Sequence, residues 1–536
     1  MMPAAPELPD AAFVVHDDAD GPRPAVRSGD RFTTADMEIA LDQARYGLRI
    51  AVSCPSRGLS RIALRWHRRL PDSALYLGDA WERGYGDLQW RHRQPERILP
   101  WYWLAHDPQD GSTLGMGVRV RPHAFCSWTV DEDGITLWLD VRSGGSPVLL
   151  GERVLDAATV VEIGSAAGES PWQTHRRLCT SLCSDPLPAR GPVVGCNNWY
   201  YAYGVDFGPA EVQRDAETIV ELADGHPVAP YCVVDAGWSP GGVAPGGPWT
   251  AGIPGLFDDM AALADGIAQR GARPGIWFRP AALSTVDREE RLRAGPRPVP
   301  EQPLDLTLDE NLAAIGDDVS RLVGWGYELI KHDFSTYDAF GRWGSPTTSE
   351  PTEPGWRFAD PRLTNAEVLL GLYRTIRASA GGALVLGCNT VGHLAAGLVD
   401  VQRTGDDTSG RSWERTRRMG VNTLAFRMAQ HGSFFTADAD CVPCTPRTPW
   451  TMNRRFLDLV ARSGTALFVS VDPKARTTET DADLRAALRL ALDGGEPGGV
   501  EALDWLHTTA PRRWNSVGGI HEYTWSESAG VWPLAV

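Results

Sequence analysis

The chain lacks the segments that would place it in a membrane or send it out of the cell. No stretch of its 536 residues approaches the roughly 18 uninterrupted apolar residues of a membrane-spanning helix. The first residues, MMPAAPELPDAAF, contain no basic segment followed by an apolar one, so no secretory signal is expected. The nine cysteines are odd in number and follow no disulfide-framework spacing. Reduced thiols and a cytoplasmic location are therefore expected.

Positive charge and metal-binding motifs are also scarce. The chain has 52 Lys and Arg against 68 Asp and Glu, a net charge of −16, which argues against nucleic acid and anionic membranes as partners. A neutral substrate fits better, and a homo-oligomer is compatible with the composition. Neither H-x-H nor H-E-x-x-H occurs, and Cys441-Val442-Pro443-Cys444 supplies half a zinc site at most. We therefore expect no metal and no other cofactor.

What the chain does have is length, apolar residues and tryptophan. Hydrophobic residues make up 43% and charged residues 22%, which is typical of a globular protein. At roughly 100–250 residues per domain, the length predicts two or three domains. The 21 tryptophans are many. Most tryptophans lie in a core, but an exposed indole face also stacks well on a pyranose ring.

The sequence divides into two parts with different patterns of apolar and polar residues. Up to about residue 185, short runs alternate apolar and polar residues, as in Arg61–Trp66 and Gly134–Val141, which predicts an N-terminal β-sandwich domain over residues 1–188. Beyond it, apolar runs alternate with helical patterns. The expected strands are Pro192–Cys196, Tyr231–Asp235, Arg273–Arg279, Tyr327–Asp333, Ala383–Cys388, Leu398–Thr404, Gly432–Thr436 and Thr465–Ser470. Expected helices between them include Pro209–Ala223, Phe257–Arg270 and Leu308–Val323.

Eight such units over residues 189–478 predict a (β/α)8 TIM barrel, so the chain is expected to be a multidomain protein that joins α/β and all-β parts. A doubly wound open sheet is the alternative, but it would normally carry a glycine-rich phosphate loop after its first strand. Here the first strand leads instead into Cys196–Tyr201. Residues 479–536 contain the alternating stretch Gly519–Trp525, which predicts a small C-terminal β element.

Polar and aromatic residues gather at the ends of the expected strands, where barrel enzymes keep their catalytic groups. Any single aspartate there is as often a helix cap or turn residue, but so many together favour a site. In chain order they are Asn198, Trp199, Asp235, Trp238, Trp277, Arg279, Lys331, Asp333, Cys388, Asn389, Arg403, Asp406, Asp407, Asp438 and Asp440.

Two of these carboxylates suit glycoside cleavage with retention, in which one attacks the anomeric carbon and the other protonates the leaving oxygen from about 5–5.5 Å away. Asp333 suits the nucleophile, because Lys331 lies two residues before it on the same strand face and favours its ionised form. Asp406 suits the acid/base, because the neighbouring Asp407 tends to raise the pKa of one of the two carboxyl groups. Asp407 remains an alternative for that role.

Five segments resemble motifs of the retaining α-galactosidase clan, glycoside hydrolase families 27 and 36, with the closer likeness to family 36 and raffinose-synthase-like proteins. They are Cys196-Asn197-Asn198-Trp199, Val234-Asp235-Ala236-Gly237-Trp238, Gly275-Ile276-Trp277-Phe278-Arg279-Pro280, Ile330-Lys331-His332-Asp333 and Arg403-Thr404-Gly405-Asp406-Asp407.

The resemblance implies specific roles for the matching residues. Asp333 would be the nucleophile and Asp406 the acid/base of an exo-acting α-glycoside hydrolase. It also implies a β-sandwich, a barrel and a C-terminal β domain. The residues expected to bind or surround the sugar are Asn198, Trp199, Asp235, Trp238, Trp277, Lys331, Cys388, Arg403, Asp407 and Asp438.

The chain also departs from this pattern. Ala236 stands where the clan has a second aspartate, and Arg279 stands where family 36 has glutamate. One charge-assisted hydrogen bond contributes about 1.5–3 kcal/mol, so its loss is large enough to change the preferred sugar. We expect an α-galactosidase-like hydrolase. The alternatives are a transglycosylase, an α-N-acetylgalactosaminidase or β-L-arabinopyranosidase specificity, and a non-catalytic sugar-binding protein on the same barrel.

Overall fold

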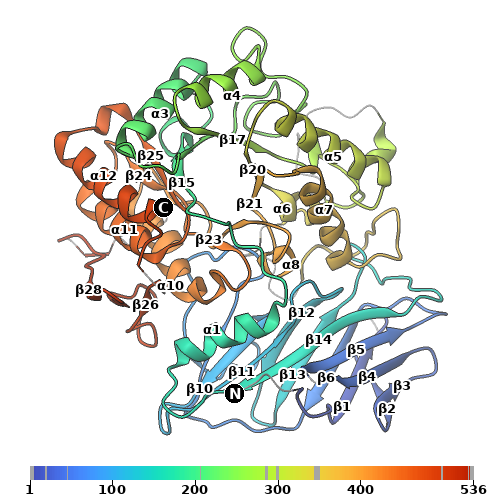
Figure 1. Cartoon of the computed structure of the whole chain (residues 1–536). Helices are drawn as coiled ribbons and strands as arrows, with labels where there is room; N and C mark the ends of the chain where they lie inside the picture. The colour runs from blue at the N-terminus through green and yellow to red at the C-terminus, as the bar shows by residue number, and fades with distance from the viewer. Residues whose placement is uncertain are drawn as a thin grey trace.

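The computed structural model describes residues 5–17, 21–44, 46–205, 207–283, 288–296, 301–342, 344, 350–496, 499–528 and 530–531. Figure 1 shows an N-terminal region of β-strands beside a ring of strands and helices, with a small β element at the C-terminal end. None of the described helices is long and apolar enough to cross a membrane.

The N-terminal region is all β up to one helix. Its strands are β1 (Ala11–Val15), β2 (Arg23–Ser28), β3 (Arg31–Thr33), β4 (Glu38–Ala44), β5 (Gly47–Ser53), β6 (Arg61–Trp66), β7 (Leu75–Gly78), β8 (Arg91–His92), β9 (Leu99–Pro100), β10 (Tyr102–His106), β11 (Thr113–Val118), β12 (Phe125–Val130), β13 (Ile135–Asp140) and β14 (Leu155–Gly164). Within the described ranges they form one antiparallel assembly in the order β8-β7-β10-β11-β14-β5-β4-β3-β2-β1-β6-β13-β12-β9.

The assembly folds back on itself at β2, which pairs with β1 on one side and with β3 on the other. Trp103 of β10 and Trp128 of β12 lie far apart in the strand order, yet their ring centroids are 6.3 Å apart. The apolar faces of the two halves therefore meet in one core, as alternating strands require. The predicted all-β N-terminal region is confirmed.

The helix α1 (Pro171–Leu182) leads from this region to the second one. Ser170 caps its first turn: the Ser170 side chain accepts from the backbone of Gln173, and the Gln173 side chain accepts from the backbone of Ser170. The strands that follow are β15 (Val194–Asn197), β16 (Tyr231–Val234), β17 (Arg273–Phe278), β20 (Leu329–His332), β21 (Leu384–Gly387), β22 (Val401–Arg403), β23 (Thr436–Asp438), β24 (Val442–Cys444) and β25 (Leu467–Val471).

These nine strands form a curled parallel sheet in the order β23-β22-β21-β20-β17-β16-β15-β25-β24, counted over the residues that the structure describes. A parallel bridge between Asp438 and Ala466 brings the start of β25 to β23, with the Ala466 amide 2.9 Å from the Ala437 carbonyl oxygen. All eight predicted strands are present in the predicted chain order, while β24 was not predicted. The strand β23 begins four residues after the start predicted at Gly432.

Helices cover the outside of this sheet (Figure 1). The longer ones are α3 (Pro209–Leu222), α4 (Met260–Gln269), α5 (Asp309–Gly324), α7 (Asn365–Ser379), α11 (Trp450–Ser463) and α12 (Thr478–Leu492). Shorter ones follow the strand ends or fill connections: α2 (Trp199–Ala202), α6 (Ser335–Phe340), α8 (Gly392–Ala395), α9 (Trp413–Thr416) and α10 (Thr423–Arg427). The helices predicted between the first strands coincide with α3, α4 and α5.

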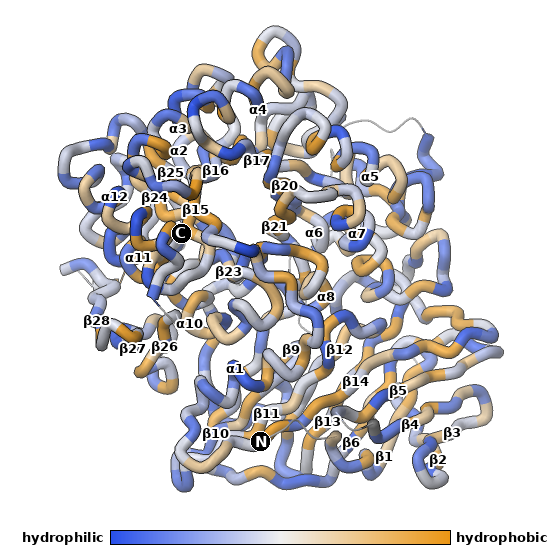
Figure 2. Tube along the Cα trace, viewed as in Figure 1, coloured by the Kyte–Doolittle hydropathy of each residue, from blue (hydrophilic) through white to orange (hydrophobic). Residues whose placement is uncertain are grey.

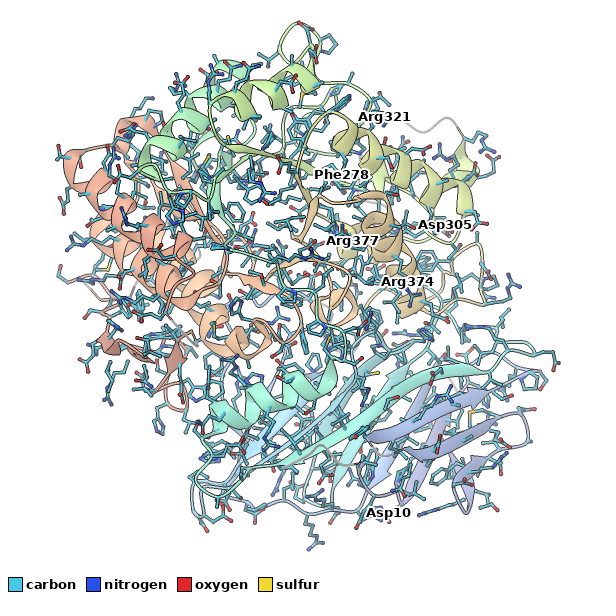
Figure 3. All side chains as sticks on the ribbon, viewed as in Figure 1. Asp10, Phe278, Asp305, Arg321, Arg374 and Arg377 are labelled. Atoms are coloured by element: carbon cyan, nitrogen blue, oxygen red, sulfur yellow. The ribbon has the colours of Figure 1, made fainter. Side chains whose placement is uncertain are left out.

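Hydropathy follows this arrangement. Figure 2 shows hydrophobic stretches along the strands of the curled sheet and more hydrophilic segments on the outer helices. Figure 3 illustrates the same division, with Phe278 on β17 and Arg321 and Arg377 on the outer helices α5 and α7. Arg377 pairs with Asp400 at 2.6 Å, which ties α7 to the segment before β22. The core therefore lies between sheet and helices, as in barrel proteins.

The C-terminal residues form a three-stranded antiparallel sheet of β26 (Glu501–Ala502), β27 (Arg513–Ser516) and β28 (Gly519–Glu522). It is held against the barrel by Trp525, whose ring stacks on Trp413 and whose carbonyl oxygen accepts the Trp413 indole N–H at 2.9 Å. The predicted boundary at 478 differs from the structure. It cuts α12, which packs on α11 and α3 and so belongs to the helical layer of the barrel.

A two-stranded hairpin of β18 (Ala282–Leu283) and β19 (Gln302–Pro303) follows β17. The nine cysteines are all buried and unpaired. No group of three or more potential metal ligands from His, Cys, Asp and Glu occurs among the described residues.

Candidate active site

The site lies at the carboxyl edge of the parallel sheet. Trp277 of β17 pairs in register with Lys331 of β20, so the ends of these strands are level. Asp235, Asp333 and Asp406 each follow a strand at this edge. The parallel fold thus brings together side chains that are far apart in the sequence.

Asp235 is the centre of a buried polar cluster. Its Oδ2 atom accepts hydrogen bonds from the Lys331 ammonium at 2.6 Å and from the Asn197 amide at 2.5 Å. Its Oδ1 atom accepts from the backbone of Ala236 at 2.8 Å, and its own N–H donates to the Asn198 side chain at 2.9 Å. Burial opposes the charge on Lys331, but Asp235, Cys388 and Asp333 together outweigh burial and hold the Lys331 pKa well above its usual value.

The direct ion partner of Lys331 thus differs from Asp333, whose ionised form we expected it to favour. The ammonium contacts the carboxylate of Asp235. Strands β16 and β20 flank β17, and the inward side chains of alternate barrel strands lie in the same layer. Lys331 of β20 therefore lies beside Asp235, the residue that follows β16.

Asp333 is held by two hydrogen bonds and stays partly exposed. The indole N–H of Trp277 donates to its Oδ2 atom at 3.2 Å, and the backbone N–H of Phe334 donates to its Oδ1 atom at 2.7 Å. Phe334 has φ 60°, in the left-handed region that is uncommon for a residue other than glycine. This turn at the end of β20 aims the carboxylate into the cavity.

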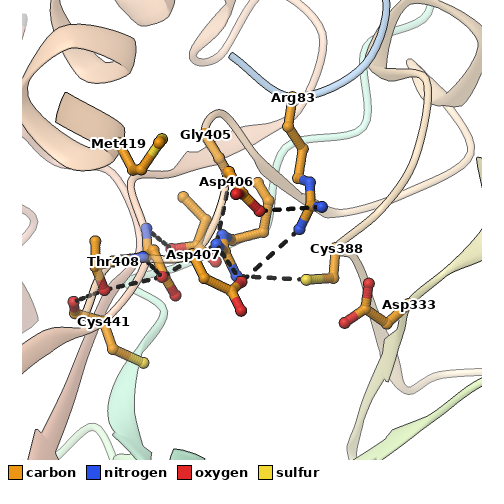
Figure 4. Close-up of polar contacts among 12 residues, drawn as sticks. Arg83, Asp333, Cys388, Gly405, Asp406, Asp407, Thr408, Met419 and Cys441 are labelled. Atoms are coloured by element: carbon orange, nitrogen blue, oxygen red, sulfur yellow. Dashed lines mark hydrogen bonds and ion pairs between the residues drawn. The ribbon is translucent and has the colours of Figure 1, made fainter. Parts of the chain in front are cut away.

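Asp406 and Asp407 lie among guanidinium groups (Figure 4). The two oxygens of Asp406 contact Arg83 at 3.1 Å and Arg415 at 2.6 Å. Arg83 also reaches Asp407 at 3.8 Å. Burial acts to raise the pKa of Asp407, but Arg403, Arg83 and Lys331 outweigh it, and the net pKa lies below the usual value. The rise in pKa that a neighbouring aspartate tends to cause is therefore not found at Asp407, because three cations lie near it.

Arg83 reaches the site from the N-terminal region, on the segment Glu82–Tyr85. The backbone of Gly84 donates to the Thr404 carbonyl oxygen and accepts from the Asp406 N–H, both at 2.9 Å. These two hydrogen bonds form a parallel bridge between Gly84 and Gly405. The N-terminal region thus supplies part of the site's wall.

Glu82 holds the same segment in place through buried hydrogen bonds. Its fully buried side chain accepts from Asn389 at 2.9 Å and from the Tyr85 hydroxyl at 2.6 Å. Gly405 has no room for a side chain, since a Cβ atom there would lie 2.2 Å from the Met419 carbonyl oxygen. Glycine before Asp406 is therefore required by packing.

A second buried cluster centres on Arg403. Its guanidinium contacts Asp440 at 3.0 Å, Asp407 at 3.2 Å and the Cys388 sulfur at 3.3 Å. Burial raises the pKa of the Cys388 thiol, and nearby Asp333 adds to the rise. A thiol that stays protonated leaves Arg403 free to neutralise the carboxylates.

Asp438 ends β23 and Asp440 follows the strand in this cluster. Asp440 accepts from the Tyr200 hydroxyl, from the Thr408 backbone at 2.7 Å and from the Thr408 hydroxyl at 2.9 Å. Asp438 accepts from the backbone of Asp440 at 2.8 Å. Burial raises the pKa of Asp438 to about 6, against the opposing charge of Arg403. Asp438 therefore joins the network through its hydrogen bond with the backbone of Asp440.

Trp238 and Arg279 have supporting roles that the sequence did not show. Trp238 is fully buried, donates to the Trp277 carbonyl oxygen at 2.8 Å and packs on Trp249, so it supports β17. This differs from the predicted direct contact with a sugar. Trp199 is half-buried, and its backbone N–H donates to Asn197.

Arg279 is a structural residue. Its buried guanidinium pairs with Asp338 and Glu301 and lies 4.2 Å from the centroid of the Phe334 ring. Arg279 thus supports the turn that presents Asp333. Its neighbours here are two acids, with which a glutamate at this position would repel rather than pair.

A cavity of about 450 Å³ joins the proposed catalytic residues. It is lined by Arg83, Tyr85, Asp333, Phe334, Asp406, Asp407 and Arg415. The other predicted residues, Asn198, Asp235, Trp277, Lys331, Cys388, Arg403 and Asp438, are buried around it. Arg83, Tyr85 and Arg415 were missed, and no motif marks them; Asp440 and Tyr200 were not assigned to the site either, although Asp440 follows a predicted strand.

The fold and this edge define a class of protein: a parallel barrel with carboxylates at its carboxyl edge, joined to a large β region. No protein-family model matches the chain, and no curated protein matches it. Solved structures do. The α-galactosidase TtGalA from Thermus thermophilus has a TM-score of 0.60 at 18% identity, over 92% of this chain and 99% of TtGalA.

Two further matches agree. The glycoside hydrolase family 36 α-galactosidase AgaA from Geobacillus stearothermophilus has a TM-score of 0.57 at 14% identity, over 92% of this chain and 72% of AgaA. The galactosidase domain of the α-galactosidase–sucrose kinase AgaSK has a TM-score of 0.58 at 15% identity, over 92% of this chain and 71% of that domain's chain. At these identities the chain shares the fold of family 36 α-galactosidases, and the resemblance drawn from its motifs is confirmed at the level of the fold.

Proposed function

We propose that the chain is a retaining, exo-acting α-glycoside hydrolase of the α-galactosidase type. The observation that carries the proposal is the single cavity that Asp333 shares with Asp406 and Asp407 at the carboxyl edge of the barrel. The fold adds support: TtGalA has been solved with p-nitrophenyl α-D-galactopyranoside and with stachyose.

In this mechanism Asp333 attacks the anomeric carbon and forms a glycosyl ester, while the leaving-group oxygen takes a proton from Asp406. Water then loses a proton to Asp406 and attacks the same carbon, which releases the sugar, frees the Asp333 carboxylate and returns Asp406 to its acid form. The Trp277 indole and the Phe334 amide hold the Asp333 carboxylate in one orientation. That fixed orientation lowers the entropic cost of attack.

The two guanidinium contacts of Asp406 suit its ionised state, in which it acts as the base of the second step. To deliver the first proton, Asp406 must take up a proton from solvent and exchange a guanidinium contact for the substrate's oxygen. The same contacts favour a second candidate function, a non-catalytic sugar-binding protein, in which Asp406 stays ionised and paired.

The buried Asp235 cluster bears on the preferred sugar. Asp235 and Lys331 form a buried ion pair at the barrel's edge, and Ala236 offers no second carboxylate. We therefore propose α-galactose or a close analogue as the glycone. A panel of p-nitrophenyl α-galactoside, α-N-acetylgalactosaminide, β-L-arabinopyranoside and α-glucoside identifies it.

The function is tested with the best substrate of that panel and the variant Asp333→Gly. The expected result is loss of turnover, partly restored by azide with formation of a glycosyl azide of inverted configuration. Release of p-nitrophenol by Asp333→Gly at the wild-type rate without azide would remove Asp333 as nucleophile. Sugar binding without any p-nitrophenol release by the wild type would favour the binding protein. Added acceptor sugars distinguish hydrolysis from glycosyl transfer through the products formed.

A further inference from the structure

Two more cavities lie in line with the catalytic one, and the mechanism uses neither. A cavity of about 370 Å³ shares Arg83 and Tyr85 with the catalytic cavity. A third, of about 330 Å³, shares Trp81, Glu96 and Ile98 with the second. Shared lining residues make the three cavities neighbours in a row, which leads from Asp406 onto the N-terminal region.

The third cavity lies on the outer face of the strands β12 and β13. Side chains alternate along these strands, so Trp128 points into the core while Ser127 and Thr129 point outward. Trp138 of β13 pairs in register with Ser127 and lines the cavity beside it. The outer face, where polar residues are expected, therefore presents an indole between two hydroxyl groups.

Both indoles on this path are fixed in place. The Trp138 N–H donates to the Thr129 hydroxyl oxygen at 3.0 Å, and Trp138 is half-buried. Trp81 lies where the second and third cavities meet, with its ring 5.3 Å from Trp101 and 5.6 Å from Phe125 between centroids. Rigid indoles lose little conformational entropy when a ligand stacks on them.

Polar groups lie beside the indoles among the apolar side chains of the lining. Glu96 is exposed and lines both outer cavities, and Ser127 and Thr129 add hydroxyl groups. Flat apolar rings beside hydrogen-bonding groups match a sugar, which has apolar C–H faces and a rim of hydroxyls. Because the path begins at the catalytic carboxylates, its occupant is the rest of the molecule whose end sugar is cleaved.

We propose that this path, defined by Tyr85, Trp81, Glu96 and Trp138, binds the further sugar units of a neutral oligosaccharide substrate. The proposal rests on the proposed function and deepens it. It assigns to the N-terminal strands β12 and β13 the recognition of the chain beyond the cleaved bond. A substrate with a single sugar and a small aglycone would not reach Trp138.

The experiment compares Trp138→Ala with the control Trp450→Ala. Trp450 is also half-buried and also donates its indole N–H to a side-chain oxygen, that of Asp483 at 2.9 Å, but lies on α11. The probes are stachyose and p-nitrophenyl α-galactoside. We expect kcat/KM for stachyose to fall about tenfold in Trp138→Ala, as loss of a stacking contact implies, while the value for the small glycoside stays within about twofold.

Trp450→Ala should leave the ratio of the two kcat/KM values unchanged, and melting temperatures show that both variants are folded. An equal loss on both substrates, or no loss on stachyose, would overturn the proposed path. If the wild type cleaves neither probe, the function fails separately, and calorimetry of stachyose binding then decides on the path. Binding weakened by Trp138→Ala would support it; binding unaffected by Trp138→Ala, or no binding at millimolar stachyose, would overturn it.

Discussion

Replacement of Arg83 by methionine tests whether the N-terminal region takes part in the reaction. Arg83 is 5% exposed at its side chain and contacts Asp406 at 3.1 Å, so solvent screens the interaction little. A hydrogen bond to a charged group contributes about 1.5–3 kcal/mol. Arg415 still pairs with Asp406 in the variant, so the loss should not exceed that range.

This energy corresponds to a fall in kcat of roughly ten- to a hundredfold if the contact positions Asp406 in the transition state. The effect should be larger for a methyl α-glycoside than for a p-nitrophenyl glycoside, because a poor leaving group depends more on the acid. Arg83→Lys keeps the charge but not the forked geometry and should recover part of the rate.

The control is Arg93→Met, since Arg93 pairs with the exposed Asp72 and contacts no residue of the site. Steady-state kinetics on both substrates and thermal unfolding of each variant complete the assay. Equal loss on good and poor leaving groups would refute the role through Asp406. So would an unchanged kcat in a variant with an unchanged melting temperature.

Two further perturbations address stability and packing. Burial raises the pKa of Asp215 from 3.8 to about 7, so its contribution to stability is complete below about pH 4 and is lost as pH rises through 7. At about 1.4 kcal/mol per pKa unit, Asp215→Asn should gain up to about 4 kcal/mol relative to the wild type between pH 4 and 8, and urea unfolding at both pH values measures it. An equal difference at the two pH values would contradict the assignment. Gly405→Ala should lower activity and cost about 1–3 kcal/mol of stability, because its Cβ would overlap the Met419 carbonyl oxygen, whereas Gly382→Ala, with open space around it, should change neither. Wild-type kinetics in Gly405→Ala would show that the loop can shift without moving Asp406.

Much of the barrel could be predicted because burial restricts which residues its strands can contain. Strands such as β16, reading YCVV, are buried on both faces, which requires a continuous apolar run that stands out in the sequence. The strand β24, reading VPC, is short and contains a proline, so its pattern is weak. The helix α12 begins with polar residues, which is why the expected boundary fell at its first turn.

The candidate site divides in the same way. Asp333 and Asp406 could be found because each follows a strand that the apolar pattern reveals. The partner of Lys331 could not, since it depends on which strands alternate around the barrel. Arg83 lies between strands of another region, and only the bridge of Gly84 to Gly405 brings it to Asp406. Contacts of this kind form when the two regions pack together, and they produce no periodic pattern in the sequence.

The bridge between Gly84 and Gly405 has a consequence for how the protein is assembled. Because Arg83 is attached to one region and Asp406 to the other, turnover would report that the two have joined correctly. A barrel expressed alone from residue 189 would keep Asp333 and Asp406 but lose the guanidinium between Asp406 and Asp407. A chain in which the two regions have not docked would then lack the Arg83 contact and turn over substrate about ten- to a hundredfold more slowly, so full activity would follow docking.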